Sequence, residues 1–274
     1  MLTRLSGDRY PLLRPIFAAL RYNLVVDSVI DGNTPAWVYA DDADYPTSAL
    51  LWDQQDAMLV AGDASDAVFN AALARALDSE ILPDARRRGV PVLSLHYPDE
   101  DWASVIEAVI LQGRGAEKAA RRYYRWGSLK VEWRQSLPPD YEVHRLTPEL
   151  LVQTELENMD QVVGWVDSFW RSHAAFAETG FGFCALRGQA VASWCLSVFA
   201  SGRDYELGLA TMPAHRNQGL ATVTAAVSVE HCLSLGGTPH WHCWEDNTPS
   251  QVVAAKVGFE RPVQYTVYRF PVSL

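Results

Sequence analysis

The segment Arg216-Asn217-Gln218-Gly219-Leu220-Ala221 decides the interpretation of this sequence, because it joins a predicted strand to a predicted helix. The strand is DYELGLAT (204–211), and the helix continues until Gly236 and Gly237 stop it. A helix N-terminus offers unpaired backbone N–H groups and the positive end of the helix dipole. A glycine there lets a phosphate approach the backbone closely. The segment therefore predicts a pyrophosphate-binding loop, although it is neither a GxxxxGK[ST] loop nor a GxGxxG loop.

A second motif follows the predicted strand PHWHCWED (239–246). It runs from Asn247 through a short predicted helix, with Thr248 as its cap and Pro249 at its first position, to Gly258-Phe259. Together the two motifs resemble the GCN5-related N-acetyltransferase (GNAT) superfamily, whose loop reads Arg/Gln-x-x-Gly-x-Gly/Ala. The stretch PHWHC is also similar to a bacterial subgroup with PHWxC in its fifth strand. The resemblance covers about residues 140–274.

The resemblance implies that acetyl-CoA binds where the fourth strand (204–211) and the fifth strand (239–246) splay apart. It assigns the cofactor to three groups of residues. These are the backbone of the fourth strand, the amides of the loop with the hydroxyl that follows it, and the start of the last helix. The implied residues are Leu209, Ala210, Thr211, Arg216, Asn217, Gln218, Gly219, Leu220, Ala221, Thr222, Asn247 and Ser250.

The implied reaction is direct transfer of an acetyl group to an amine, which needs a base, an oxyanion donor and sometimes an acid. Glu206, in the fourth strand, is the candidate base, and an exposed or salt-bridged carboxylate is the alternative. The family's usual tyrosine acid would fall at Ala254. Tyr265, Tyr268 or Glu245 are the substitutes, unless the thiolate leaves unassisted or the tyrosines are packed strand aromatics.

Two other features have bland alternatives. His240 and His242 alternate along one strand, but no third metal ligand is nearby, so a structural role is expected and no metal is predicted. Trp165 and Trp170 lie in the segment that overhangs the acceptor pocket in the family. They line that pocket or belong to the core.

Composition limits the partners. The 274 residues carry 33 acidic and 23 basic side chains, a formal net charge of −10, which disfavours nucleic acid and anionic membranes. No stretch approaches the roughly 20 apolar residues of a membrane span, and the start lacks an apolar signal segment. The four cysteines form no CxxC pair. We expect buried reduced thiols and a cytoplasmic protein.

The fold class is α/β, with a mixed sheet in a C-terminal GNAT domain. Pro138 and Pro139 mark the boundary, giving domains 1–135 and 136–274. The first half repeats the order of strands and helices without a matching glycine loop. The hypothesis is a degenerate GNAT-like lobe without a cofactor site, and an unrelated α/β substrate domain is the alternative.

The sequence thus predicts an acetyl-CoA-dependent N-acetyltransferase with a small-molecule amine as acceptor. A weakly catalytic or non-catalytic acyl-CoA-binding or sensor protein is the main alternative, and a purely structural tandem domain is another. The identity of the amine and the oligomeric state are not specified by the sequence.

Overall fold

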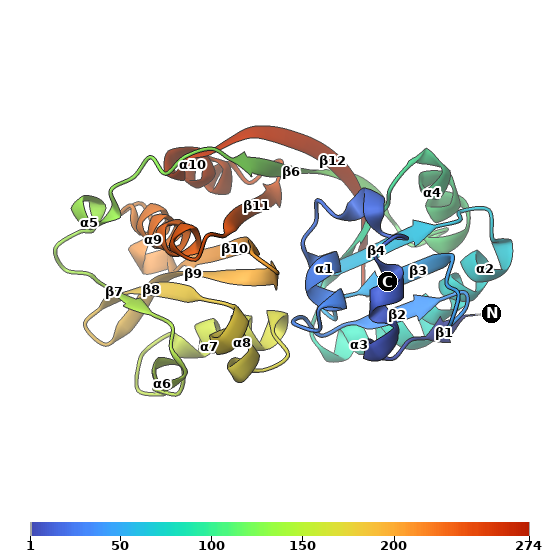
Figure 1. Ribbon diagram of the computed structural model, residues 1–274, viewed down its shortest axis with the longest axis horizontal. Coiled ribbons are helices and arrows are strands. Elements are labelled where there is room, and N and C mark those ends of the chain that lie inside the picture. Colours follow the sequence, from blue (N-terminus) through green and yellow to red (C-terminus); the bar gives the residue numbers. More distant parts are fainter. Residues whose placement is uncertain (1, 274) are drawn as a thin grey trace. The chain divides into compact units, whose positions relative to one another are not determined.

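The computed structural model describes residues 2–273, which form two compact units (Figure 1). The first unit contains the residues up to Ala120 together with those from Thr266 onward, and the second contains Arg121–Tyr265. Both units have α-helices packed on a mixed sheet, as the sequence predicts.

The first unit begins with a short strand and two 3-10 helices and continues through three antiparallel strands, a long helical segment, a parallel strand and a last helix. Its elements are β1 (Thr3–Arg4), 3-10 helices Gly7–Leu13 and Ala18–Leu20, α1 (Val25–Ile30), β2 (Trp37–Ala40), β3 (Ser48–Trp52), β4 (Ala57–Gly62), α2 (Ala67–Ala76), a π-helical segment Leu77–Ile81, α3 (Leu82–Arg87), β5 (Val92–His96), α4 (Glu100–Val105) and a second π-helical segment Ile106–Ile110.

β6 (Glu117–Trp126) then leads into the second unit. The elements that follow are α5 (Trp133–Ser136), β7 (Glu142–Arg145), α6 (Pro148–Leu151), α7 (Met159–Phe169), α8 (His173–Thr179), β8 (Gly182–Arg187), β9 (Ala190–Ser201), β10 (Asp204–Thr211), a 3-10 helix Pro213–His215, α9 (Leu220–Ser234), β11 (Thr238–Trp244) and α10 (Thr248–Val257). β12 (Phe259–Pro271) leads back to the first unit, to which its residues from Thr266 onward belong.

The π-helical segment Leu77–Ile81 separates α2 from α3, and Pro83, which lacks a backbone N–H, stands in the first turn of α3. One helix-cap prediction needs correction. The cap of α10 is Asn247 rather than Thr248, because the Asn247 Oδ1 accepts a hydrogen bond from the Ser250 amide at 3.1 Å. Pro249 accordingly stands at the second helical position.

The second unit has three layers. Its sheet follows the order β6-β11-β10-β9-β8-β7, in which β10 and β11 are parallel and the other neighbours whose pairing is resolved are antiparallel. Helix α9 covers one face of the sheet, while α7 and α8 lie on the other face (Figure 1). The 15 residues of α9 are apolar nearly all round because the sheet, α5 and α10 all contact it.

The compact units have different limits from the domains expected at 1–135 and 136–274, and strand pairing explains the difference. Residues Arg121–Tyr124 of β6 pair with Trp241–Trp244 of β11, and Tyr268–Pro271 of β12 pair with Val92–Leu95 of β5. Each sheet is therefore completed by the strand that follows the last helix of the other unit. The functional role assigned to each domain stays a prediction.

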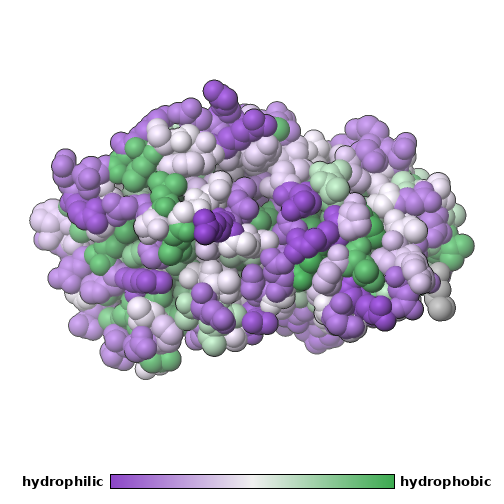
Figure 2. Space-filling model, viewed as in Figure 1, coloured by the Kyte–Doolittle hydropathy of each residue, from purple (hydrophilic) through white to green (hydrophobic). Residues whose placement is uncertain are grey.

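The visible surface is largely hydrophilic (Figure 2). Hydrophilic side chains spread over much of the visible face of both units, with hydrophobic residues between them (Figure 2). Within the described residues, no helix combines the length and the apolar character that a membrane span requires. All four cysteines are buried and unpaired, as predicted.

Candidate active site

The fourth and fifth strands of the second unit separate in the middle of β10. The parallel pairing of β10 with β11 joins Asp204–Glu206 to Thr238–His240, and no further pair between these strands occurs in residues 2–273. Beyond Glu206, β10 continues to Thr211 on β9 alone, and β11 continues on β6. The edge of β10 that faced β11 thus has unpaired backbone groups of the kind that accept an extended ligand.

A β-bulge marks the same point. Glu206 lies opposite Phe199, but Leu207 lies opposite Ser197, so Val198 is the extra residue on β9. The Phe199 ring packs 5.5 Å from Phe169 of α7, which places Glu206 on the α7 face of the sheet. The residue Glu206 is only 7% exposed. The candidate base is therefore a buried carboxylate at the fork of the two strands.

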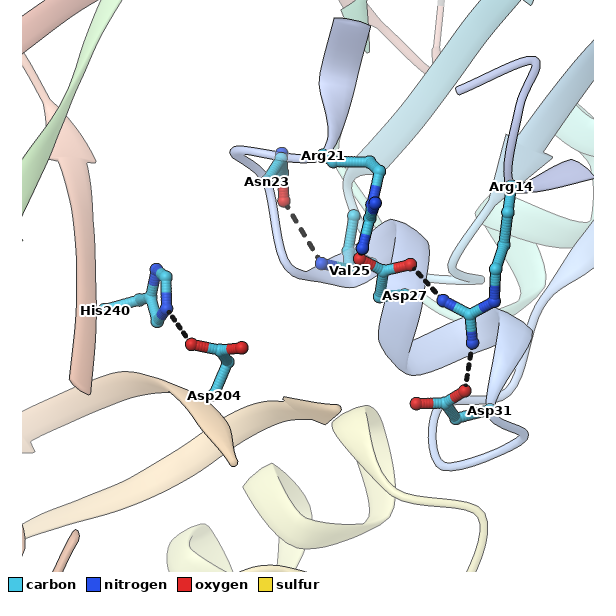
Figure 3. Close-up of polar contacts among 8 residues, drawn as sticks. All are labelled: Arg14, Arg21, Asn23, Val25, Asp27, Asp31, Asp204 and His240. Atoms are coloured by element: carbon cyan, nitrogen blue, oxygen red, sulfur yellow. Dashed lines mark hydrogen bonds and ion pairs between the residues drawn. The ribbon is translucent and has the colours of Figure 1, made fainter. Parts of the chain in front are cut away.

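Two polar neighbours lie on the face that carries Glu206. His240 is its register partner on β11, and the His240 Nε2 lies 2.9 Å from Asp204 Oδ1 (Figure 3). His240 and Asp204 are more exposed than Glu206, with side-chain accessibilities of 28% and 47%. A buried carboxylate, an imidazole and an exposed carboxylate thus adjoin at the fork.

The helical segment expected above the acceptor pocket has one core tryptophan and one at the site. Trp170 is 2% exposed, and its indole N–H donates to the Ser197 carbonyl at 2.8 Å. Trp165 lies over Gly208 of β10, where an added Cβ would come within 3.0 Å of the indole. Gly208 therefore permits the close approach of α7 to the strand that carries Glu206.

The predicted pyrophosphate loop has the open geometry that anion binding needs. Gly219 is the N-cap of α9 with φ of 82°, it offers no capping side chain, and the first turn holds no acidic residue. Asn217 is also left-handed, with φ of 63°. The five amides from Asn217 to Ala221 have no acceptor among the described residues. They and the helix dipole make this end of α9 electropositive.

The remaining predicted cofactor residues border this loop or β11. The Arg216 Nε donates to the Thr211 carbonyl at 3.3 Å, which ties the loop to the end of β10. The Thr222 hydroxyl has no partner within residues 2–273. Ser250 accepts a 3.1 Å hydrogen bond from the Trp241 indole, so Asn247 and Ser250 hold α10 against β11.

Sequence reasoning missed Tyr141 and His215. The Tyr141 hydroxyl donates to Gln218 Oε1 at 2.8 Å and lies 2.8 Å from His215 Nδ1. Tyr141 is 5% exposed and packs in a small core with Leu220, the first residue of α9. Tyr141 stands 74 and 77 residues from its two partners, so no local pattern reveals the contact.

The candidate acids are distributed over both units. Tyr265 ends the second unit, and its hydroxyl lies 3.0 Å from His242 Nδ1. Glu245 forms an ion pair with Arg122 at 2.8 Å. Tyr268 belongs to the first unit, where it donates a hydrogen bond to Glu107, and burial raises its pKa to about 12. The structure thus does not bring Tyr268 into the same unit as Glu206.

The first unit has the same order of elements but a closed counterpart of the loop. After β4, the Asp66 side chain caps α2 by accepting from the amides of Val68 and Phe69 at 2.9 and 3.0 Å. The buried Trp102 indole donates to the Gly62 carbonyl at 2.9 Å, at the end of β4. The Asp66 side chain thus bonds amides of the kind that the second unit leaves open at the start of α9.

Comparison with known proteins gives the family. The model of the GNAT acetyltransferase family matches residues 14–268, nearly the whole chain. The chain belongs to the GNAT acetyltransferase family. It is therefore an N-acetyltransferase, and the GNAT family generally uses acetyl-CoA as its acyl donor.

Relatives support the same assignment. The chain is 26% identical over 268 residues to an uncharacterized N-acetyltransferase, YdfB, of Bacillus subtilis (strain 168), and 98% of each chain is covered. A GCN5-related N-acetyltransferase-like protein from Streptococcus suis 89/1591 has a similar fold, with a TM-score of 0.71 and 19% identity over 96% of this chain and 99% of that one. A tandem GNAT protein from the clavulanic acid biosynthesis pathway matches with a TM-score of 0.59 and 14% identity, over 100% and 99% of the two chains.

Proposed function

We propose that this protein transfers the acetyl group of acetyl-CoA directly to a primary amine of a small molecule. The observation that carries the proposal is the coincidence of two open features in one unit. The unpaired edge of β10 and the uncapped N-terminus of α9 are consecutive in the chain, and the Arg216–Thr211 hydrogen bond joins them. An extended ligand with a diphosphate at one end matches both.

The residues present fit acetyl-CoA. The five free amides of Asn217–Ala221 would bind the pyrophosphate, with Thr222 as a further donor. The backbone of Leu209 and Thr211 would bond the pantetheine amides and the acyl carbonyl along the unpaired edge. The Ala210 backbone instead faces β9, because the amide of Met212, two residues further on, donates to the Ala192 carbonyl of β9. Asn247 and Ser250 would border the pantetheine arm. Acetyl-CoA supplies the acetyl group already activated as a thioester.

Glu206 would act as the base. A protonated amine is not a nucleophile, so the acceptor nitrogen must lose a proton before it attacks. Glu206 is buried at the fork of β10 and β11, where the acyl carbonyl would lie beside the amide of Leu209. That amide would donate to the carbonyl oxygen. Of the two candidate tyrosines, Tyr265 lies in the same unit as Glu206 and would donate a proton to the departing thiolate.

The charge of the site supports an amine acceptor. Glu206 and Asp204 are two carboxylates on one face of the sheet, and the whole chain carries −10. A negative field attracts cationic ligands on encounter. Trp165 adds an aromatic surface to the same face, and indole faces attract alkylammonium groups.

One acetyl-CoA per chain is expected. The counterpart of the loop in the first unit carries Asp66 at its helix cap, and this carboxylate would repel a pyrophosphate. The Trp102 indole donates to the Gly62 carbonyl at the end of β4, so a buried side chain of the first unit itself bonds this end of the strand. The first unit is thus proposed to be a lobe without a cofactor site, and titration calorimetry with CoA measures the stoichiometry.

Thiol release from acetyl-CoA across a panel of small amines tests the proposal. The wild type should release CoA with at least one amine, and Glu206→Gln should lower kcat by about 100-fold or more, the lower range for general-base catalysis. Glu230→Gln is the control, because Glu230 bonds Trp133 and Arg134 outside the site.

Other outcomes separate the alternatives. Protection by CoA against heating without turnover of any amine would support an acyl-CoA-binding or sensor protein. The absence of any CoA-dependent change in melting temperature would support a structural role.

A further inference from the structure

We infer that Tyr141 is a positioning residue for the donor, because its hydroxyl holds the loop of Arg216–Ala221 in the conformation that binds the pyrophosphate. This inference rests on the proposed function. It concerns a residue outside the loop motif, at the point where the chain enters β7.

The Tyr141 hydroxyl makes two hydrogen bonds to the loop segment. The phenol has one proton, which it donates to Gln218 Oε1 at 2.8 Å. The second contact, 2.8 Å to His215 Nδ1, then has the imidazole as donor and the phenol oxygen as acceptor. One hydroxyl thus bridges residues 215 and 218, on the two sides of Arg216 and Asn217.

The segment that this hydroxyl bridges contains left-handed backbone. Asn217 has φ of 63° and Gly219 has φ of 82°, so two left-handed residues flank Gln218. A non-glycine residue in this region costs about 1–2 kcal/mol relative to the right-handed conformation. The loop therefore needs support from its surroundings, and the bonds to His215 and Gln218 supply it on both sides of Asn217.

Tyr141 is itself held in place by a small core. Its ring is 5% exposed and packs with Ala185, Ala192 and Leu220. Its amide donates to the Pro138 carbonyl at 3.1 Å. The His215 ring lies edge-on at 5.7 Å. The hydroxyl is fixed by the core, so it determines where the loop lies and which way the amides point.

Tyr141→Phe removes the hydroxyl and keeps the ring. We expect the Kd for CoA and the KM for acetyl-CoA to rise about tenfold, the ratio that one to two net hydrogen bonds provide. At saturating donor, kcat and the KM for the amine should not change. The Tyr39→Phe variant is the matched control, because Tyr39 is an equally buried tyrosine whose hydroxyl donates to Glu80 at 2.9 Å in the first unit.

A truncated donor isolates the loop. Acetyl-pantetheine lacks the pyrophosphate, so wild type and Tyr141→Phe should have equal KM values for it. A second variant, Gln218→Met, removes the other end of one bond and keeps the loop amide. It should weaken CoA binding in the same direction, and the double variant should be less than additive.

The outcomes are distinct. A wild-type protein that binds no CoA would refute the proposed function and this inference together. Wild-type affinity for CoA in Tyr141→Phe, or an equal loss with acetyl-CoA and acetyl-pantetheine, would refute the inference and leave the proposed function standing.

Discussion

Replacing Gly219 by alanine separates the stability of the loop from its binding function. At φ of 82° an L-residue costs about 1–2 kcal/mol, and the new Cβ meets no atom within 4 Å. The folded protein should therefore lose only this backbone energy. A phosphate at hydrogen-bond distance from the surrounding amides would meet the methyl group and withdraw from them.

The effect on binding is larger. Losing two charge-assisted hydrogen bonds of about 1.5 kcal/mol each weakens binding by about 3 kcal/mol, or about 100-fold in Kd. Gly188→Ala is the matched control, because Gly188 has φ of 60° and equally open surroundings in the β8–β9 turn. The two variants should lose similar stability, while only Gly219→Ala loses CoA affinity. Gly219→Glu adds a negative charge and should abolish binding.

Calorimetric titration with CoA and thermal unfolding of the wild type and the three variants provide the measurement. Equal CoA affinity in Gly219→Ala and Gly188→Ala would refute the assignment of the pyrophosphate to this loop. A much greater loss of stability in Gly219→Ala than in the control would show that Gly219 is needed for folding rather than for close approach of the ligand.

Three further predictions concern packing and ionisation. Gly208→Ala should destabilise the protein by about 1–3 kcal/mol in thermal unfolding, because the new Cβ would lie 2.5 Å from Val198 Cγ1 and 3.0 Å from the Trp165 ring; unchanged stability would refute the close packing. Burial lowers the pKa of His231, because the interior disfavours the charged imidazolium. The folded protein should therefore lose stability as the pH falls below the ordinary histidine pKa of about 6.5. The variant His231→Gln should lack this loss in pH-dependent unfolding. Burial raises the pKa values of the Cys184, Cys195 and Cys232 thiols to about 12. A thiol reagent at pH 8 should therefore modify these three cysteines only after the protein unfolds. Fast reaction of the native protein would contradict their burial.

Local patterns predict much of the second unit. The helix stop at Gly236 is a local signal, and α9 ends directly before it as expected. The open end of α9 follows from Gly219, which has no side chain to cap the helix. The segment after Thr147 forms three short helices, α6, α7 and α8, since Asn158 is left-handed and Trp170 is extended. Local propensity does not reveal such breaks.

Long-range contacts explain what the sequence left out. The bulge beside Glu206 depends on the register of β9 against β10, which no residue pattern specifies. The clamp at Tyr141 and the closure of the first unit's loop by Trp102 join residues at least 40 positions apart. Residues 121–124 of β6 pair with β11, so the second compact unit begins before the boundary expected at Pro138.

The pairing of β12 with β5 also affects the order in which the protein can fold during synthesis. The first unit has its β5 by His96, and one edge of β5 pairs with β4, but the partner of the other edge is Tyr268–Pro271, more than 170 residues later. At about 5–20 residues per second, a ribosome needs about 10–35 s to cover that interval. During synthesis the edge of β5 waits without its native partner, so the first unit completes its sheet only after the second has emerged. The N-terminal half is thus synthesised first and finished last.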